Sequence, residues 1–458
     1  MQKISAVTRE QGLKPGLSKR QAIMISLGGS IGTSLFLSSG IALGYAGPAV
    51  LLSYVIAGFI AVAMVLSLSE MAVVHPSAGS FGVYAETYLN PWAGFVVRYT
   101  YWFAQVIATG FEAVAAGIYM TWWFPEAPVW LWSIGFAALV IYVNSRSVHS
   151  FGTAEYWFSF IKVAAIVLFI VIGTARIFGL GGPATGLHNL YQLPGGFMPH
   201  GFHGVWMAVI LGMLSFVGIE VIAVTSGEMA NPEIAIPAAL RTMALRLFLF
   251  YALALTVVAA VLPWTSLTGR GVTVAQSPFV KILAMTHIPY AAGIMNFVIV
   301  SAALSGMNAN IYLCSRMLFS LSRGGYAPSW LGRLSKAGAP TAAVAFSGAC
   351  ILLAAAVAKI TPKAYAYLQG VALFGAISVW VLILVSHIAF RRRRGAAALP
   401  VLMPFFPAIQ IAGLGLLAAL AITMALDKDW NVSWMVGLPW LVLLSIAYFV
   451  QKRVKPSA

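Results

Sequence analysis

Long apolar runs recur along the chain from Ile23 to Val450, and short polar segments separate them. An α-helix needs about 20 apolar residues to cross the hydrocarbon core of a bilayer. Counted in this way, the pattern predicts about twelve membrane-spanning helices, and hence an all-α polytopic membrane protein. The expected helices cover Gln21–Leu43, Ala49–Val74, Phe95–Trp122, Val129–Arg146, Ala154–Phe178, His203–Ser226, Arg241–Leu262, Tyr290–Leu321, Thr341–Ala358, Ala364–Phe390, Val401–Leu426 and Val432–Val450.

The composition agrees with a membrane protein and argues against other classes. Of the 458 residues, 61% are hydrophobic and 8% are charged, whereas about a quarter of the residues in a soluble domain are charged. The net charge of +16 could suggest a nucleic-acid partner, but the basic residues concentrate in particular loops, as membrane topology requires. Cys314 and Cys350 lie in apolar surroundings without metal-ligand spacing. We therefore expect a lipid bilayer as partner, and no nucleic acid, metal or cofactor.

The distribution of Lys and Arg predicts the orientation in the membrane. Of the 27 residues, six lie at one set of helix ends, Lys162 lies inside an expected helix, and the other 20 lie at the opposite ends or in the terminal tails. Because Lys and Arg accumulate in cytoplasmic loops, both termini are expected in the cytoplasm, with the protein in the inner (plasma) membrane. The expected organisation is a cytoplasmic tail over 1–20, a transmembrane domain over 21–450 and a cytoplasmic tail over 451–458.

Ionisable residues inside expected membrane helices are candidate functional groups, because each costs at least about 2.5–3.5 kcal/mol to insert. Lys162 could extend its stem toward the cytoplasmic interface, or it could face the protein interior and exchange a proton during a functional cycle. Glu112 is too far from either helix end for the first explanation, so it either pairs with a buried group or touches a substrate. The role of Glu220 stays open. Glu70 and Arg316 lie nearer helix ends and are expected to reach the interface.

The first expected helix contains the stretch "LGGSIGTSLFLSSG", Leu27–Gly40, which is unusually rich in glycine and hydroxyl residues. The spacing of Gly28 and Gly32 alone is compatible with close packing of two helices. The neighbouring hydroxyl groups favour a local unwinding, whose free N–H groups and following helix dipole would hold an anion. Such backbone is tolerated at membrane depth only where it is buried in protein or lines a cavity. The hydroxyl residues are Ser30, Thr33 and Ser34.

A second candidate interruption lies in the sixth expected helix, where Gly218 stands beside Glu220 in "LSFVGIEV". Paired interruptions in corresponding helices of two halves point to a transporter site built on inverted repeats. The halves would be 21–178 and 203–390, with 401–450 appended. N–H groups at one break and carbonyl oxygens at the other would together suit a zwitterion.

Several long segments of the chain are similar to those of one family. The first-helix "GGSIGTSLFLSSG", the "SEMAVVHPSAGSFGVYAETYLNPWAGF" that starts at Ser69 and the "SFVGIEVIAVTSGEMANPEIAIPAAL" that starts at Ser215 resemble the amino acid permeases of the amino acid–polyamine–organocation superfamily. "GIYMTWWFPEAPVWLW", "FSFIKVAAIVLFI" and "NANIYLCSRMLFSLSRGGYAP" resemble the third, fifth and eighth helices of the same family. The sequence departs from the family pattern at Ser34, where glycine is usual, and at Asn310 and Ile311, where serine and glycine are more frequent.

The resemblance implies a LeuT-type fold and proton-coupled import of an amino acid by alternating access. It also implies that Glu112 is the third-helix acid and that Lys162 occupies the place of a cation in sodium-coupled relatives, so both are expected to couple protons. The residues expected to bind the substrate are Ser30, Ile31, Gly32 and Thr33 at its carboxylate, Ser215, Phe216, Val217 and Gly218 at its ammonium group, and Glu112.

The sequence leaves other functions open. An amine, polyamine or γ-aminobutyrate transporter, or an amino acid exchanger, would have the same fold. An integral membrane enzyme is disfavoured because the seven histidines are scattered and none pairs with an acid at helical spacing inside an expected helix, so no catalytic residues are expected. A sensor that has lost transport is a further alternative, and the sequence does not indicate an oligomeric state.

Overall fold

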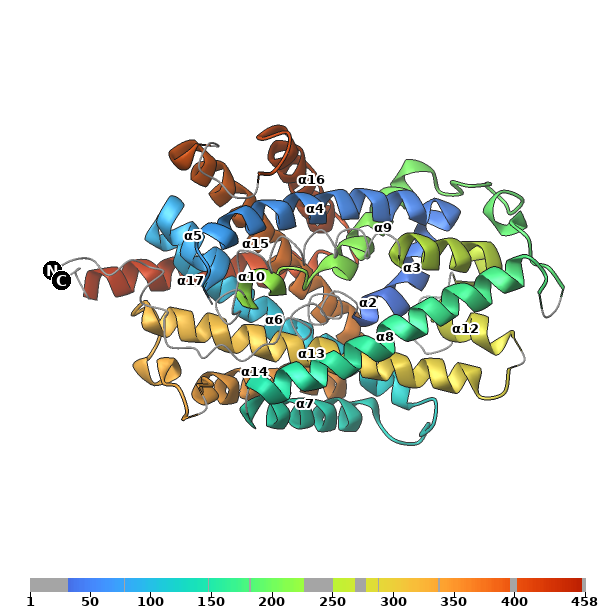
Figure 1. The fold of residues 1–458 in the computed structure, drawn as a ribbon, viewed down its shortest axis with the longest axis horizontal. Helices are drawn as coiled ribbons and strands as arrows, with labels where there is room; N and C mark the ends of the chain where they lie inside the picture. The colour runs from blue at the N-terminus through green and yellow to red at the C-terminus, as the bar shows by residue number, and fades with distance from the viewer. Residues whose placement is uncertain are drawn as a thin grey trace.

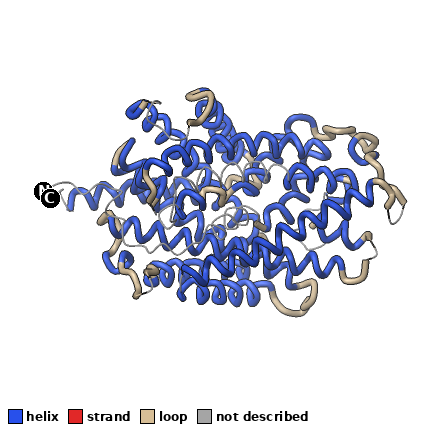
Figure 2. Tube along the Cα trace, in the orientation of Figure 1, coloured by secondary structure: helices blue, strands red, loops and turns tan. Residues whose placement is uncertain are grey.

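The computed structural model describes residues 32–77, 79–146, 148–180, 183–225, 250–267, 277–286, 288–336, 338–395 and 402–454. Over these ranges every regular element is helical and no β-strand occurs (Figure 2). The helices are α2 (Thr33–Phe36), α3 (Ser38–Ala46), α4 (Val50–Val74), α5 (Ser80–Tyr88), α6 (Pro91–Met120), α7 (Val129–Arg146), α8 (Val148–Ile177), α9 (Gly201–Phe216), α10 (Val221–Thr225), Phe250–Val261, α12 (Pro278–Ala284), α13 (Ala291–Arg323), α14 (Thr341–Ile360), α15 (Ala364–Arg394), α16 (Ala408–Leu426) and α17 (Val432–Val454), with 3-10 turns η2 (Gly47–Ala49), η3 (His188–Leu190), η5 (Trp264–Leu267) and η7 (Ser329–Gly332).

The membrane-spanning character predicted from the sequence is confirmed. Eight helical stretches in the described part of the chain are long and apolar enough to cross a membrane, and three shorter apolar helices accompany them. One of the eight, Ser38–Val74, combines α3 and α4, which meet at η2. Each of the twelve expected helices therefore has a helical counterpart, and the protein is an all-α polytopic membrane protein.

Local sequence explains where several helices begin and end. The α6 helix starts earlier than its apolar run because the Asn90 side chain accepts a hydrogen bond from the Ala93 N–H (2.9 Å) and Pro91 occupies the first turn. The α15 helix ends at Gly395, whose φ of +71° favours glycine. The α16 helix starts at Ala408, later than predicted, because prolines at 404 and 407 interrupt the apolar run before it.

Three long helices form the centre of the molecule. They are α6, α13 and α15: α6 packs against both of the others, and it also contacts α7, which lies at the lower edge of the bundle in Figure 1. Of the most apolar part of α13, 83% is buried, against 22% for α17 and 28% for α16. The appended helices α16 and α17 thus lie at the periphery, where both pack against α15, α16 also packs against α4, and α17 also packs against α6. Polar groups in the middle of α13 are therefore enclosed by protein, whereas Arg323 at its end is exposed.

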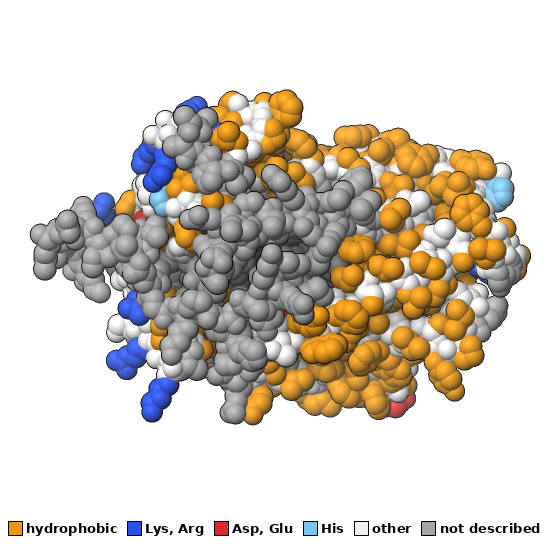
Figure 3. Space-filling view, viewed as in Figure 1, with side chains coloured by type: hydrophobic (Ala, Val, Ile, Leu, Met, Phe, Trp, Pro, Cys, Tyr) orange, Lys and Arg blue, Asp and Glu red, His pale blue; other side chains and the backbone are white. Residues whose placement is uncertain are grey.

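The surface separates apolar and basic regions. On the face shown in Figure 3, hydrophobic side chains cover a broad band, and the visible Lys and Arg side chains gather mainly at the left end. Large apolar side chains of the described residues are strongly exposed, for example Leu353 on α14 (73%) and Leu443 on α17 (62%). Such a surface suits contact with lipid chains rather than with water.

Candidate functional site

In the described part of the chain, the first helix is α2, which begins at Thr33 inside the expected first span. Gly32, which precedes it, has an extended backbone (φ −94°, ψ −170°). It is the N-cap residue of α2, and no side chain caps this end of the helix. Leu37 then separates the four-residue α2 from α3. Ser30 and Ile31, which were also expected at this break, lie outside the described residues. Among the residues that the structure describes, the chain therefore enters the helix at the position where the glycine-rich pattern predicts an interruption.

The predicted interruption of the sixth span is present. The α9 helix ends at Phe216, Val217 is extended (φ −63°, ψ 135°), and α10 begins at Val221. Gly218 between them has a φ of +103°, a conformation that only glycine adopts without strain. The break is therefore encoded by that one residue.

Glu220, whose role the sequence left open, bonds across this break. Its Oε2 accepts a hydrogen bond from the Gly218 N–H (3.1 Å), and its Oε1 accepts one from the Tyr101 hydroxyl (3.0 Å). The Gln105 amide also donates to Oε1 (3.4 Å). Since Tyr101 and Gln105 lie on α6, the carboxylate ties the broken helix to the central one.

Glu112 lies against the first break. The Thr33 hydroxyl donates to Glu112 Oε2 (2.7 Å), and the Thr33 N–H donates to Oε1 (3.4 Å). Two glycines leave room for the carboxylate: a Cβ added at Gly32 would lie 2.7 Å from Oε1, and one at Gly306 on α13 would lie 3.2 Å from it. Of the two roles considered for Glu112, pairing with a buried partner is present, and the partner belongs to the break itself.

A cavity of about 40 Å³ lies between the two breaks. At roughly 10–15 Å³ for each water, it holds about three or four water molecules. Gly32, Glu112 and Val217 line it, and α6, α13 and α15 supply most of the remaining wall. The polar residues in that wall are Ser34, Tyr101, Gln105 and Asn310.

The other expected residues of the sixth span lie behind the cavity wall. The Ser215 hydroxyl is within hydrogen-bond distance of the Tyr54 hydroxyl (3.1 Å), and its carbonyl accepts a bond from the Tyr251 hydroxyl (2.6 Å). The Phe216 ring packs edge-on against Tyr251, with 5.0 Å between the ring centroids. Neither Ser215, Phe216 nor Gly218 lines the cavity. A carbonyl oxygen can accept a second bond, but in this conformation the residue of this break that faces the cavity is Val217.

Lys162 is fully buried on α8, so its stem does not extend to the interface. Its Nζ donates to the Ser305 hydroxyl on α13 (2.7 Å). Ser305 in turn donates to Glu155, another buried residue of α8. Glu155 was not predicted from the sequence, because it stands at the start of its apolar run. The available signal was spacing, since residues seven apart share one face of a helix.

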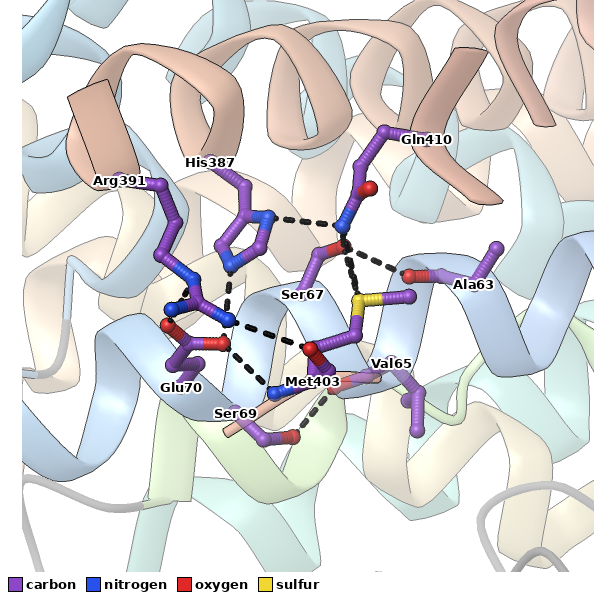
Figure 4. Close-up of polar contacts among 9 residues, drawn as sticks. All are labelled: Ala63, Val65, Ser67, Ser69, Glu70, His387, Arg391, Met403 and Gln410. Carbon is purple, nitrogen blue, oxygen red and sulfur yellow. Dashed lines mark hydrogen bonds and ion pairs between the residues drawn. The ribbon is translucent and has the colours of Figure 1, made fainter. Parts of the chain in front are cut away.

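Glu70 is buried too, contrary to the expectation that it reaches the interface. Figure 4 shows its carboxylate between the side chains of His387 and Arg391 on α15. Its Oε1 lies 2.7 Å from Arg391 Nε, and its Oε2 lies 3.2 Å from His387 Nε2. The Met403 N–H donates to Oε2 (3.0 Å), and the Gln410 amide on α16 lies 3.0 Å from the other histidine nitrogen. This cluster fastens α4 to α15 and α16.

Arg316 is likewise buried, with 3% exposure. Its guanidinium lies 3.8 Å from the centre of the Tyr312 ring on the same helix, and it donates to the Ser315 hydroxyl (2.9 Å). Proximity to a helix end therefore did not predict exposure for either Glu70 or Arg316, because the surrounding protein covers both side chains.

Comparison with known proteins agrees with the sequence patterns. The family model described as "Amino acid permease" matches residues 21–458. The "Uncharacterized amino acid permease YtnA" of Bacillus subtilis (strain 168) is 38% identical over 98% of this chain and 97% of its own. The "Putative histidine permease" of the same organism is 37% identical over 97% of this chain and 95% of its own length. The "Probable threonine/serine transporter YbxG" of that organism is 36% identical over 96% of this chain and 95% of its own length. The chain belongs to the amino acid permease family.

Proposed function

We propose that this permease imports an amino acid together with protons by alternating access around the cavity between the two helix breaks. Gly32 and Thr33, with Ser30 and Ile31, would receive the substrate carboxylate. Carbonyl groups of the sixth-span break, from Ser215 to Gly218, would receive the ammonium group. Glu112 would contact the substrate and, with Lys162, couple its movement to protons.

The observation that carries the proposal is a cavity lined by both breaks. Gly32 comes from the first break and Val217 from the second. Backbone that is not in a helix is costly in a membrane unless it lines a cavity or is buried. N–H groups of the first break and carbonyl groups of the second would give the site opposite polarities at its two ends, which is the requirement for a zwitterion.

Alternating access is supported by matching lengths in the two expected repeats, 21–178 and 203–390. In chain order α6 has 30 residues and α13 has 33, α7 has 18 and α14 has 20, and α8 has 30 and α15 has 31. The α6–α13 and α7–α14 pairs also pack against each other. Equivalent helices that meet in this way suit two repeats that move relative to each other around one site. Helices α16 and α17 would be accessory to that movement.

Coupling to protons is supported by the burial of Lys162. Burying an ammonium group away from water and lipid headgroups costs free energy, so a permanently charged Lys162 with no functional role is a poor explanation for its burial. Lys162 is 0% exposed and bonds to Ser305. Its gain and loss of a proton would change the charge beside the first break in each cycle.

A small amino acid is the substrate class that fits the cavity best. The three relatives carry names for different substrates or for none, at nearly equal identity. The cavity of about 40 Å³ must widen to admit any amino acid, and the smallest amino acids require the least widening. Its polar wall suits a side chain such as that of serine or threonine. A polyamine would need a longer pocket and would leave the carboxylate site empty.

We propose that the protein lies in the plasma membrane with both termini in the cytoplasm. The basic residues at one end of the described surface support this arrangement (Figure 3). Labelling of single cysteines at the termini and in the 183–200 loop tests it. Access to the termini from outside intact cells would reverse the orientation.

Uptake into proteoliposomes tests the proposed function. With an inward proton gradient, the wild-type protein should accumulate a radiolabelled amino acid above the external concentration, and Lys162→Ala should abolish accumulation while retaining substrate binding. Accumulation by Lys162→Ala at the wild-type level would refute the coupling role. Uptake that requires substrate on both sides would indicate an exchanger. Competition by amines that lack a carboxylate would indicate an amine or polyamine transporter. Binding without uptake would indicate a sensor.

A further inference from the structure

The buried carboxylate of Glu155 lies two helical turns from Lys162 on the same face of α8. Seven residues at 1.5 Å each separate their backbones by about 10 Å along the helix. Ser305 on α13 bridges the two side chains: Lys162 Nζ donates to its hydroxyl (2.7 Å), and the hydroxyl donates to Glu155 Oε1. All three side chains are 0% exposed. An ammonium, a hydroxyl and a carboxylate thus stand in one continuous line of hydrogen bonds.

The remaining contacts of Glu155 extend this line away from Lys162. Its Oε2 accepts a bond from the Asn308 amide (3.1 Å), and the Asn308 carbonyl accepts one from the Asn144 amide (2.8 Å). These two bonds fix which way the Asn308 amide faces, because its NH₂ group must point to the carboxylate. Ser159, one turn from Glu155, also lies within bonding distance of Oε1 (3.4 Å).

The line ends near the expected cytoplasmic surface. Asn144 belongs to the last turn of α7, which ends at Arg146, and it is 7% exposed. Glu155 is in the third turn of α8, which begins at Val148. Lys162 lies deeper, seven residues further along α8, where it bonds to Ser305 on α13. The polar groups therefore lead from the middle of the membrane toward the side to which an importer releases its proton.

We propose that Glu155 is the proton acceptor for Lys162 and the first station of a proton exit path to the cytoplasm. This inference rests on the proton coupling proposed above. An N–H bond of the Lys162 ammonium breaks and its proton passes to Ser305 Oγ, while the proton of the Ser305 hydroxyl passes to Glu155 Oε1. The products are a neutral amine, an unchanged hydroxyl and a carboxylic acid. Water that enters from the cytoplasmic side then removes the proton from Glu155, which restores the carboxylate.

Two substrate fluxes in proteoliposomes separate this role from a structural one. Counterflow at equal pH on both sides measures binding and alternating access without net proton movement. Accumulation under an imposed proton gradient, recorded with the pH change inside the vesicles, measures coupling. Glu155→Gln keeps the size of the side chain but cannot accept a proton at neutral pH. It should keep counterflow near the wild-type rate, lose the internal pH change, and slow gradient-driven uptake by at least about a hundredfold, as expected for loss of an acid–base group.

Further variants decide between the possible results. Glu155→Asp retains a proton acceptor and should restore part of the coupled uptake. Ser305→Ala removes only the bridging hydroxyl and should reproduce the selective loss of coupling. Its matched control is Ser301→Ala on the same helix, since the buried Ser301 hydroxyl bonds only to the Val298 carbonyl of its own helix (2.6 Å) among the contacts of the described residues. This control should behave as wild type.

Wild-type accumulation by Glu155→Gln would overturn the inference while leaving proton coupling intact, provided that Lys162→Ala has lost it. If Lys162→Ala also accumulates substrate, the proposed proton coupling itself fails. If Glu155→Gln is inactive in both fluxes because it misfolds, Ser305→Ala decides. Full coupled uptake by Ser305→Ala overturns the relay, and selective loss of coupled uptake supports it.

Discussion

Replacement of Gly32 with alanine is the smallest change that crowds the candidate cavity. The backbone there is extended and any residue can adopt it, so the added methyl group acts only through its contacts. That group would lie 2.7 Å from Glu112 Oε1, so the carboxylate must retreat by about 0.7 Å to reach an ordinary contact of about 3.4 Å. Movement of this size breaks the Thr33 N–H bond, which is already 3.4 Å long.

The loss of this bond sets the expected magnitude. The substrate is proposed to bind the break that this bond holds in place, so the contribution of a hydrogen bond to a charged group, about 1.5–3 kcal/mol, is lost from the binding-competent arrangement. The affinity for the amino acid should therefore fall by roughly tenfold to a hundredfold. Binding to purified protein and the KM of uptake in proteoliposomes both measure this change. Gly135→Ala on α7 is the matched control, because nothing lies within 4 Å of a Cβ added there. An unchanged affinity in Gly32→Ala would refute the assignment of this break to the substrate.

Three further changes test other parts of the structure. Glu112→Gln keeps the volume but weakens the contacts with Thr33, so uptake should fall at least about tenfold at an unchanged melting temperature; wild-type kinetics would make Glu112 merely structural. Glu70→Gln leaves Arg391 and His387 buried without their carboxylate, which should lower the free energy of unfolding in detergent by about 3–5 kcal/mol; an unchanged unfolding midpoint would show that the cluster in Figure 4 contributes nothing. Burial and the charge of Arg394 lower the pKa of His75 in the folded protein from its ordinary value of 6.5. As pH falls below about 6.5 the unfolded chain therefore binds a proton more readily than the folded protein, and the free energy of unfolding should decline. His75→Gln should flatten that decline, and an equal dependence of the free energy of unfolding on pH in both proteins would exclude His75 as its source.

The helices were predictable because the bilayer imposes a simple requirement on composition. About twenty apolar residues in succession have few alternatives to a membrane helix. The interruption at Gly218 was also predictable, since a glycine and an acid inside an apolar run both disfavour an intact lipid-facing helix. The departures concern ends: Asn90 and Pro91 extend α6 backwards, and the prolines before Ala408 delay α16. Capping and proline geometry act locally on where a helix begins or ends, and the length of an apolar run does not indicate them.

The candidate site was predicted only as far as single helices allow. Glu112 and Lys162 stood out because each is deep in its own run. Glu155 and Glu70 did not, since each lies near the end of a run and is buried by other helices, α13 in one case and α15 with α16 in the other. Which side chains meet across helices depends on their rotation and depth. The sequence of one helix contains neither.

A structure of the purified protein with a bound amino acid tests the central claim most directly. The account predicts the substrate between the two breaks, with its carboxylate within hydrogen-bond distance of backbone N–H groups beside Gly32 and Thr33. Its ammonium group should lie against carbonyl oxygens between Ser215 and Gly218. A substrate bound elsewhere, or bound in this cavity through side chains alone while both breaks stay empty, would contradict the account.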